Sequence, residues 1–349
     1  MMKPIRKEAI RLLDNFFAKA ERVTLVTHTH PDGDAVGCTV ALMAFLKSVY
    51  RTDVRIVYPD PIAARLRFLT RGVRSVVASE EPQAARERLA ETDLIVCLDC
   101  NGFSRVEGLK DILADSSARK VLIDHHLNPD AASFDLVFSE TEISSTCELL
   151  FDILVSTSEA GGDASKLPMP VLRALLTGMT TDTNNFANSV FPSTFEMASR
   201  MLEAGVDRDG ILAELYNRNR ENRLRMTGHL LKDNMRIFPN GVSCIVVRRA
   251  DIEEYDIREG ETEGIVNMPL TLDKVRMSIF LREDEGFFRV SIRSKRGTSA
   301  FRLASTRFHG GGHEQAAGGR LYFPGDIADA SMAEAFLERI TDDYFKTEE

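Results

Sequence analysis

The sequence predicts an α/β protein with an N-terminal, doubly wound and mostly parallel sheet, a smaller C-terminal mixed α/β domain, and a cleft between them. Short apolar segments alternate with longer helical patterns over the first part of the chain, as in βαβ units. The length of 349 residues also exceeds what one hydrophobic core usually supports. We therefore expect a first domain over residues 1–205, a connecting helix over 206–236 and a second domain over 237–349.

The first domain should alternate strands and helices. Apolar residues at helical spacing predict an amphipathic helix over residues 4–20, and prolines at 59 and 61 end an early strand. Ser145 and Glu148 have the spacing of a capping box at the start of a further helix. The expected helices are 4–20, 35–50, 82–91 and 145–155, and the expected strands are 23–27, 54–58, 94–98 and 121–123.

The second domain begins after a highly charged helical segment. Strands are expected over 242–247, 275–281 and 287–293, with a turn at Glu285 and Gly286. A glycine-rich loop over 308–313 should lead into a helix that begins near Glu314. Glycines allow backbone N–H groups to approach an anion, and a helix N-terminus would add positive charge to such a site.

Composition and charge exclude several classes of protein. A net charge of −9 argues against coating of long duplex nucleic acid, which requires many basic contacts to phosphate. The segment 289–320 nevertheless carries seven basic residues and one acid, which suits a short anionic substrate. There is no apolar run that could span a membrane and no signal-peptide core, and the odd number of cysteines argues against a disulfide framework. We therefore expect a cytoplasmic location.

Acidic and imidazole side chains follow several of the predicted strands and helices. His28, Asp32 and Asp34 follow the first strand, Asp99 follows the strand 94–98, and Asp124 precedes two histidines. A further acid, Asp182, follows the apolar segment 171–179. Open α/β sheets place their sites at the carboxyl ends of strands. Carboxylates suit hard divalent cations, and imidazole adds affinity for transition metals, so the set indicates a two-metal centre.

This pattern resembles the DHH phosphoesterase superfamily with a DHH-associated C-terminal domain. The resemblance rests on His-x-x-Pro-Asp-x-Asp at 28–34, a lone Asp99, Asp-His-His at 124–126, a Thr-Asp-Thr segment around Asp182, and Gly-Gly-Gly-His at 310–313. It covers most of the chain. Within the superfamily, the sequence is most similar to the branch of bacterial nanoRNases (oligoribonucleases) that also act as 3'-phosphoadenosine 5'-phosphate phosphatases.

The resemblance implies a role for each motif residue. His28 and Asp32 would hold one ion, Asp34 and His125 the other, and Asp99 and Asp182 would be shared. Asp124 would orient an imidazole, and His126 would act at the scissile phosphate. The expected substrate-binding residues are Arg293, Ser294, Gly310, Gly311, Gly312 and His313.

These assignments predict a phosphoesterase with two divalent ions, most naturally Mn(II), that hydrolyses short oligoribonucleotides and 3'-phosphoadenosine 5'-phosphate. The sequence does not decide whether the protein forms a homodimer. An alternative substrate is cyclic or linear di-AMP. An alternative of another class is a non-catalytic nucleotide-binding regulator, but such a protein would be expected to have lost metal ligands, and all six positions are filled.

Overall fold

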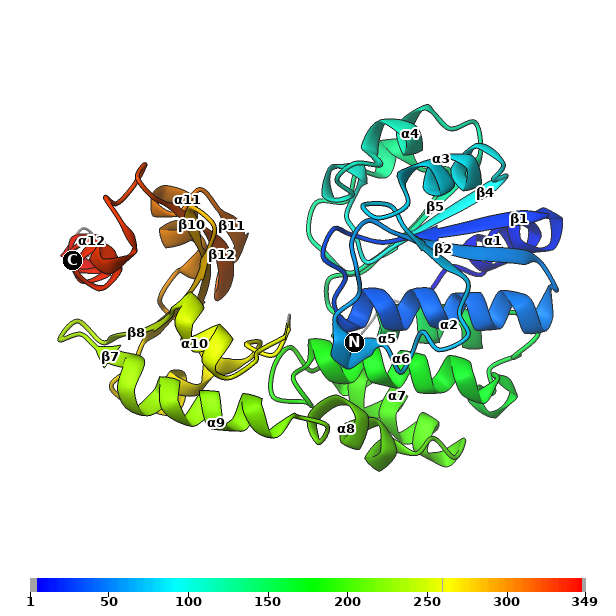
Figure 1. Ribbon diagram of the computed structural model, residues 1–349. Coiled ribbons are helices and arrows are strands. Elements are labelled where there is room, and N and C mark those ends of the chain that lie inside the picture. The colour runs from blue at the N-terminus through cyan, green and yellow to red at the C-terminus, as the bar shows by residue number, and fades with distance from the viewer. Residues whose placement is uncertain (1–4, 259, 347–349) are drawn as a thin grey trace. The chain divides into compact units, whose positions relative to one another are not determined.

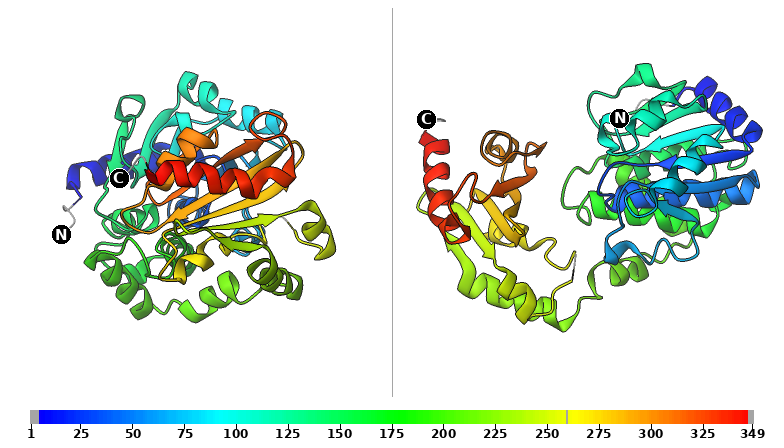
Figure 2. Two further views of the ribbon diagram at one scale, coloured as in Figure 1. Left: turned by 90° about the vertical axis from the view of Figure 1, so that its left-hand side faces the viewer. Right: turned by 45° about the horizontal axis from the view of Figure 1, so that its top comes forward.

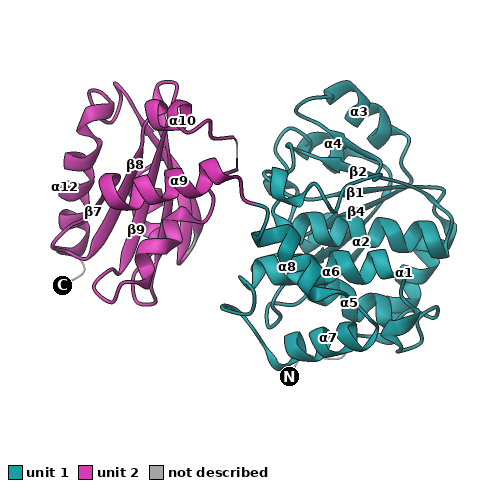
Figure 3. Cartoon of the chain, turned by 60° about the horizontal axis from the view of Figure 1, so that its bottom comes forward, with its two compact units in different colours: residues 1–218 teal, residues 219–349 magenta. Residues whose placement is uncertain are grey.

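The computed structural model describes residues 5–258 and 260–346, apart from the side chain of His313. The chain divides into two compact units, Met1–Arg218 and Asn219–Glu349 (Figure 3). Each unit has its own six-stranded sheet and its own buried apolar core. Within the described residues, no helix combines the length and apolar character that crossing a membrane would require.

The first unit contains a parallel sheet in the order β3-β2-β1-β4-β5-β6. The direction of strand order reverses between β1 and β4, and ligands of open α/β sheets bind at such a switch point. Parallel strands are buried on both faces, which explains their nearly continuous apolar sequences. The strands are β1 (Arg22–Val26), β2 (Asp53–Tyr58), β3 (Ser75–Val77), β4 (Leu94–Leu98), β5 (Arg119–Asp124) and β6 (Leu136–Ser139).

Helices cover both faces of this sheet (Figure 1). Leu25 of β1 points into the core on one face, and its neighbour Val26 points into the core on the other, as the strand period requires. One face packs against α1 (Lys7–Lys19), α2 (Gly33–Val49), α5 (Thr146–Val155), α6 (Met169–Asp182) and α7 (Pro192–Glu203), and the other against α3 (Pro82–Ala90) and α4 (Lys110–Asp115). The predicted doubly wound fold is confirmed.

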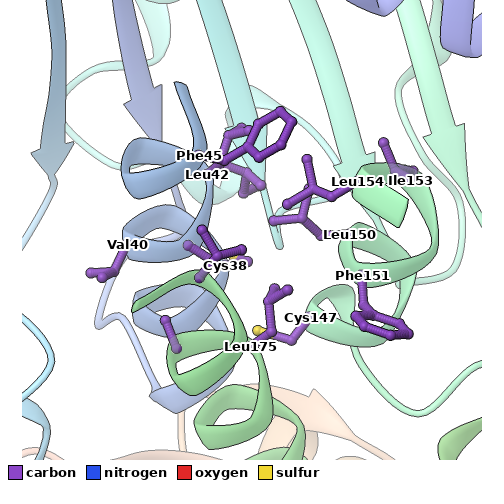
Figure 4. Close-up of a cluster of buried hydrophobic side chains, with 14 of the residues drawn as sticks. Cys38, Val40, Leu42, Phe45, Cys147, Leu150, Phe151, Ile153, Leu154 and Leu175 are labelled. Atoms are coloured by element: carbon purple, nitrogen blue, oxygen red, sulfur yellow. The ribbon is translucent and has the colours of Figure 1, made fainter. Parts of the chain in front are cut away.

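Close packing of α2 against α6 positions part of the functional site. A Cβ atom on Gly37 of α2 would lie 2.8 Å from the carbonyl oxygen of Ala174 of α6, and one on Gly178 of α6 would lie 3.2 Å from the Cα atom of Asp34 of α2. Only glycine permits this approach, which brings the N-terminus of α2 beside the C-terminus of α6. Figure 4 shows the apolar side chains that α2, α5 and α6 bury together. Each fully buried leucine there contributes about 1.5–3 kcal/mol to folding.

The second unit is built on a mixed sheet in the order β11-β12-β10-β9-β8-β7. Strands β8 and β9 are parallel, and the other neighbours are antiparallel. One face packs against α11 (Ala300–Arg307) and α12 (Ala333–Lys346), and Figure 2 shows α12 lying across the strands. The opposite face packs against α9 (Glu221–His229). The strands are β7 (Met235–Ile237), β8 (Val242–Val247), β9 (Met277–Asp284), β10 (Phe287–Ser294), β11 (Gly311–His313) and β12 (Ala316–Tyr322).

The expected helix after the glycine-rich loop is wrong. The loop leads instead into the β11–β12 hairpin, with no helix near Glu314. A Cβ on Gly310 would lie 1.9 Å from the carbonyl oxygen of Gly318, and one on Gly319 would lie 2.2 Å from that of Phe308. These glycines are therefore required by close backbone packing, and glycine also disfavours the interior of a helix.

The expected single connecting helix over 206–236 is two helices, α8 (Arg208–Tyr216) and α9, with the boundary between the units at 218–219. Arg220 adopts an extended conformation between them and forms ion pairs with Asp256 and Glu261. These ion pairs favour the break in the helix. They also neutralise part of the acidic segment 251–263.

Candidate metal centre

The acidic and imidazole side chains gather at the carboxyl edge of the parallel sheet. His28 follows β1, Asp99 follows β4, and Asp124 ends β5. These three strands are neighbours, so the residues that follow them meet at the switch point. The first turn of α2 adds Asp34, and the last residue of α6 adds Asp182.

Three groups of potential ligand atoms form there, and within each group the atoms lie within 4.8 Å of one another. Asp99 belongs to two groups and His125 to two. His125 Nε2 lies 3.6 Å from Asp99 Oδ1 and 3.6 Å from Asp182 Oδ2. The groups are His28–Asp32–Asp99, Asp34–His125–Asp182 and Asp99–His125–His126.

The loop after β1 orients His28 and Asp32. The Nδ1 atom of His28 lies 2.8 Å from the carbonyl oxygen of Thr29, so Nδ1–H can donate to it. This bond leaves Nε2, which lies 3.5 Å from Asp99 Oδ2 and 3.8 Å from Asp32 Oδ1. Asp32 also caps α2, because its Oδ1 accepts hydrogen bonds from the N–H groups of Asp34 and Ala35. Imidazoles held in this way are typical of metal ligands.

Asp34 is fixed by the N-terminus of α5. Its Oδ2 accepts from the N–H of Thr146 at 2.7 Å, and its Oδ1 accepts from the N–H of Cys147 at 2.9 Å. The side chain is buried, so these two bonds offset part of the cost of removing a carboxylate from water. The helix N-terminus holds Asp34 in one orientation.

Asp99 is the centre of the cluster. It is buried, and its carboxylate lies within 3.6 Å of ring nitrogens of His28, His125 and His126. Its backbone φ is +57°, a left-handed conformation that Asp tolerates better than most residues. The Oγ1 of Thr146 donates a hydrogen bond to Asp99 Oδ1 at 2.9 Å. From the sequence, Thr146 was predicted as part of the start of a scaffold helix, and its contact with Asp99 was not predicted.

Asp124 orients His126 rather than His125. Its Oδ1 lies 2.8 Å from His126 Nδ1, and its Oδ2 accepts from the backbone N–H of His126 at 3.0 Å. Asp124 is buried, so it positions the imidazole of His126 and is not itself open to a substrate. With Nδ1–H directed to a carboxylate, Nε2 is the nitrogen of His126 suited to act on a substrate.

The pKa values show an excess of buried negative charge. Burial raises the pKa of Asp34 well above its usual range, and Asp99 and Asp182 raise it further. Burial raises the pKa of Asp182 to about 8, again with help from Asp99. Burial lowers the pKa of His28, but hydrogen bonds to Asp32 and Asp99 outweigh it and bring the pKa to about 11. Protons on Asp34, Asp182 and His28 therefore reduce the buried negative charge when no cation is bound. A divalent cation would reduce this negative charge further.

The donor set fits a pair of divalent ions. It combines four carboxylates with two imidazoles in two groups of three, and the ion-pair partners of buried Asp99 are imidazoles. Carboxylate oxygens and imidazole nitrogens are ligands of Mn(II), Fe(II), Co(II) and Zn(II), and Mg(II) prefers oxygen alone.

Without metal, the free energy of unfolding is expected to fall as pH rises from 6.5 to about 8. The pKa of His28 is raised from 6.5 to about 11, so its stabilising contribution is complete below pH 6.5 and is lost progressively above it. The pKa of Asp182 is raised from 3.8 to about 8, so its ionisation over this range also disfavours the folded state. Denaturant unfolding of chelator-treated protein measures the slope.

Asp182→Asn should remove the part of this slope that Asp182 contributes. A free energy of unfolding that increases between pH 6.5 and 8 in the metal-free protein would contradict the assignment of charge.

The predicted substrate-binding residues lie in the second unit. Ala316 of β12 is the register partner of Arg293 on β10 and of His313 on β11. The three residues therefore form one row across the sheet. The Arg293 guanidinium donates to the carbonyl oxygen of Ile292 at 2.9 Å and is half-buried. The Oγ of Ser294 donates to the carbonyl oxygen of Thr298, so its role in this structure is to hold a turn. The side chain of His313 lies outside the described part.

Several other basic side chains of the segment 289–320 are engaged within the unit. Arg289 pairs with Asp284, and the Lys295 ammonium donates to the carbonyl oxygen of Leu272. Arg302 lies over the ring of Tyr344. The segment is therefore a weaker basic surface than its charge count indicates.

Comparison with known proteins identifies the family. The model of the DHH family, N-terminal domain, matches residues 22–179, and the DHHA1 domain matches residues 241–342. The crystal structure of an exopolyphosphatase-related protein from Bacteroides fragilis is 32% identical and superposes with a TM-score of 0.89, covering 99% of this chain and 98% of that chain. This chain belongs to the DHH family.

Relatives of this DHH protein are named for two related activities. The bifunctional oligoribonuclease and PAP phosphatase NrnA of Thermus thermophilus is 29% identical over 342 residues, 96% of this chain and 95% of the relative. The cyclic-di-AMP phosphodiesterase PdeA of Listeria monocytogenes is 26% identical over 346 residues, 96% of this chain and 50% of the relative. Membership of the DHH family and the names of these relatives support assignment as a hydrolase, and the clustered carboxylates and imidazoles could hold divalent metal ions.

Proposed function

We propose that this DHH protein is a two-metal phosphoesterase that hydrolyses short oligoribonucleotides to mononucleotides and removes the 3'-phosphate of 3'-phosphoadenosine 5'-phosphate. The observation that carries the proposal is the pair of ligand groups, His28–Asp32–Asp99 and Asp34–His125–Asp182. Each offers three donors, and Asp99 also approaches His125 of the second group. The name of the Thermus thermophilus relative supports the choice of substrate.

The proposed metal ligands form two sets, one for each ion. His28 and Asp32 would hold one ion, Asp34 and His125 the other, with Asp99 and Asp182 shared. Two divalent ions held by these residues would supply a nucleophile at neutral pH and stabilise charge on the phosphoryl oxygens. Thr146 keeps Asp99 in place through its hydroxyl, and the N-terminus of α5 keeps Asp34 in place.

His126 would act on the substrate directly. Asp124 holds its Nδ1–H, so Nε2 can donate a proton or a hydrogen bond to an oxygen of the scissile phosphate. His126 is thus suited to assist departure of the leaving oxygen.

Net charge and the second unit favour a short substrate. A protein of net charge −9 gains little from long stretches of phosphate, so binding energy has to come from local contacts. The row that contains Arg293 and His313, with the exposed Gly310 and half-buried Gly311 at the edge, is the proposed substrate-binding part of the second unit. Mn(II) is the proposed metal, since the donor set mixes imidazole with carboxylate.

A second candidate is hydrolysis of cyclic or linear di-AMP, which the name of the Listeria monocytogenes relative favours. This chain spans half the length of that relative. We favour the oligoribonuclease function because the NrnA relative is matched over nearly its whole length.

Initial rates with a panel of substrates test the proposed function. Chelator-treated protein is reconstituted with Mn(II) and given an RNA dinucleotide, 3'-phosphoadenosine 5'-phosphate, cyclic di-AMP and pyrophosphate at matched concentrations. We expect the highest kcat/KM for the dinucleotide, measurable turnover of the bisphosphate, and loss of both without metal. A higher kcat/KM for cyclic di-AMP would favour the second candidate, and turnover of pyrophosphate alone would contradict both.

A further inference from the structure

Two stacked phenylalanines of the first unit form a surface that the proposed function has not used. The rings of Phe186 and Phe195 have centroids 5.3 Å apart and planes inclined by 17°. Phe186 packs partly against the main core, whereas Phe195, on α7, is 55% exposed. A large aromatic ring held rigidly against a second ring and left open to solvent is suited to stack another flat group.

We propose that Phe195, backed by Phe186, is a stacking platform for one nucleobase of the oligonucleotide. This inference rests on the proposed function, because it needs a nucleotide bound at the metal centre. The first unit would then contain a subsite for a base as well as the metal centre that acts on the phosphate. Stacking uses the π-face that every base has, so the subsite binds bases without sequence preference.

Both phenylalanines adjoin segments that hold the metal centre. Phe186 lies four residues after Asp182 in the turn that follows α6. Phe195 follows Thr194, whose Oγ1 donates to Oε2 of buried Glu148 at 2.7 Å. The same oxygen of Glu148 accepts from Ser144, two residues before Thr146, which contacts Asp99. The platform is therefore linked to residues of the proposed active site through these hydrogen bonds and through the turn that follows Asp182.

The turn that carries Phe186 has an unusual backbone. Asn184, Asn185 and Phe186 have successive φ values of +47°, +57° and +66°. Asparagine tolerates this left-handed region, but a phenylalanine there is strained. Two bonds hold it, from Asn185 N–H to the carbonyl oxygen of Thr180 at 2.7 Å and from Phe186 N–H to Thr183 Oγ1 at 3.0 Å. Such strain is retained mainly where a fixed side-chain position is needed.

An arginine completes the platform. The Arg208 guanidinium lies 5.7 Å from the centroid of the Phe186 ring, and its Nη2 donates to Asn185 Oδ1 at 2.7 Å. The position places a positive charge beside the two rings. Aromatic rings combined with arginine are the usual means of binding unpaired bases and their phosphates. A base inside a duplex cannot offer its face in this way, so the ligand is single-stranded.

Phe195→Ala tests the platform, with Leu202→Ala as the matched control. Leu202 lies on the same helix and is 50% exposed, but it has no part in the stack. We expect Phe195→Ala to lower kcat/KM for an RNA dinucleotide by about 10- to 100-fold, the range of one lost base stack. The same variant should leave kcat/KM unchanged for a dinucleotide of abasic riboses, and Phe195→Trp should retain activity on both substrates. Leu202→Ala should behave as wild type.

A binding measurement separates this inference from the proposed function. Fluorescence of a dinucleotide that contains 2-aminopurine should be quenched on binding to the wild type and much less on binding to Phe195→Ala. If the wild type quenches this probe but hydrolyses no oligonucleotide, the proposed function fails and the platform stands. Equal losses on the normal and abasic dinucleotides would overturn the platform. So would unchanged kcat/KM accompanied by a smaller mass in light scattering, because Phe195 would then belong to an interface between protein chains.

Discussion

Asp99→Ala is expected to abolish turnover of every substrate. Asp99 is buried, belongs to two of the three ligand groups and lies within 3.6 Å of three imidazoles. Its removal should weaken both ions together. We expect kcat to fall by more than about 1,000-fold, since loss of a single group that stabilises a transition state already costs on the order of 100- to 1,000-fold.

Metal analysis of the purified variant, alongside kcat, measures this effect. Asp152→Asn is a matched control, because Asp152 is a half-buried carboxyl of the same unit outside the three ligand groups. The control should retain metal and turnover. An Asp99→Ala protein with two bound ions per chain and near wild-type kcat would show that Asp99 is not a shared ligand.

His126→Ala is expected to lower kcat by about 100- to 10,000-fold, the usual range for loss of a general acid or base. The proposed metal ligands are untouched, so two ions should remain bound. The loss should be similar for a dinucleotide and for a small phosphodiester without a base, since His126 acts at the phosphate common to both. Steady-state kinetics on the two substrates, with metal analysis, measures it.

Arg293→Ala is the comparison variant, because it lies in the second unit. It should keep both ions and lose about 10-fold or more in kcat/KM on the dinucleotide, as expected for one charge-assisted hydrogen bond. The small diester should be unaffected. If Arg293→Ala damaged both substrates equally while His126→Ala damaged neither, the proposed division between chemistry and substrate binding would be wrong.

The sheet of the first unit could be predicted because its information is local. Apolar runs such as Leu94–Leu98 are followed at once by an acid, and strand neighbours in a doubly wound sheet place such acids together. The short strands β3 and β6 and the short helix α4 were not predicted, since three to six residues carry too little periodicity. Longer α7 was also missed, although Pro192 marks its start.

Contacts between distant segments could not be predicted from local patterns. The closeness of Asp34 to Asp182 depends on Gly37 and Gly178, which allow α2 and α6 to pack tightly. The contact of Thr146 with Asp99 joins residues 47 positions apart. Sequence patterns give the kinds of residue in a site, whereas packing of this kind gives their orientation.

The glycine-rich segment shows how one pattern can support two structures. Glycines near an anion and glycines in a crowded hairpin look alike in sequence. The structure requires Gly310 and Gly319 for backbone packing of the hairpin, and Gly311 is the member with room beside it, since the nearest atom to its Cβ position is 3.9 Å away. A role for this segment in substrate binding therefore remains a prediction that Gly311 can test best.

Dependence of rate on chain length tests the central claim most directly. Single-stranded RNAs with the same labelled end, a dinucleotide, a pentanucleotide and a long strand, are compared at equal end concentration with Mn(II)-reconstituted protein. A two-metal centre served by local contacts in a chain of net charge −9 predicts the highest rate for the dinucleotide, a lower rate for the pentanucleotide and little degradation of the long strand. Degradation of the long strand as fast as the dinucleotide would contradict the account.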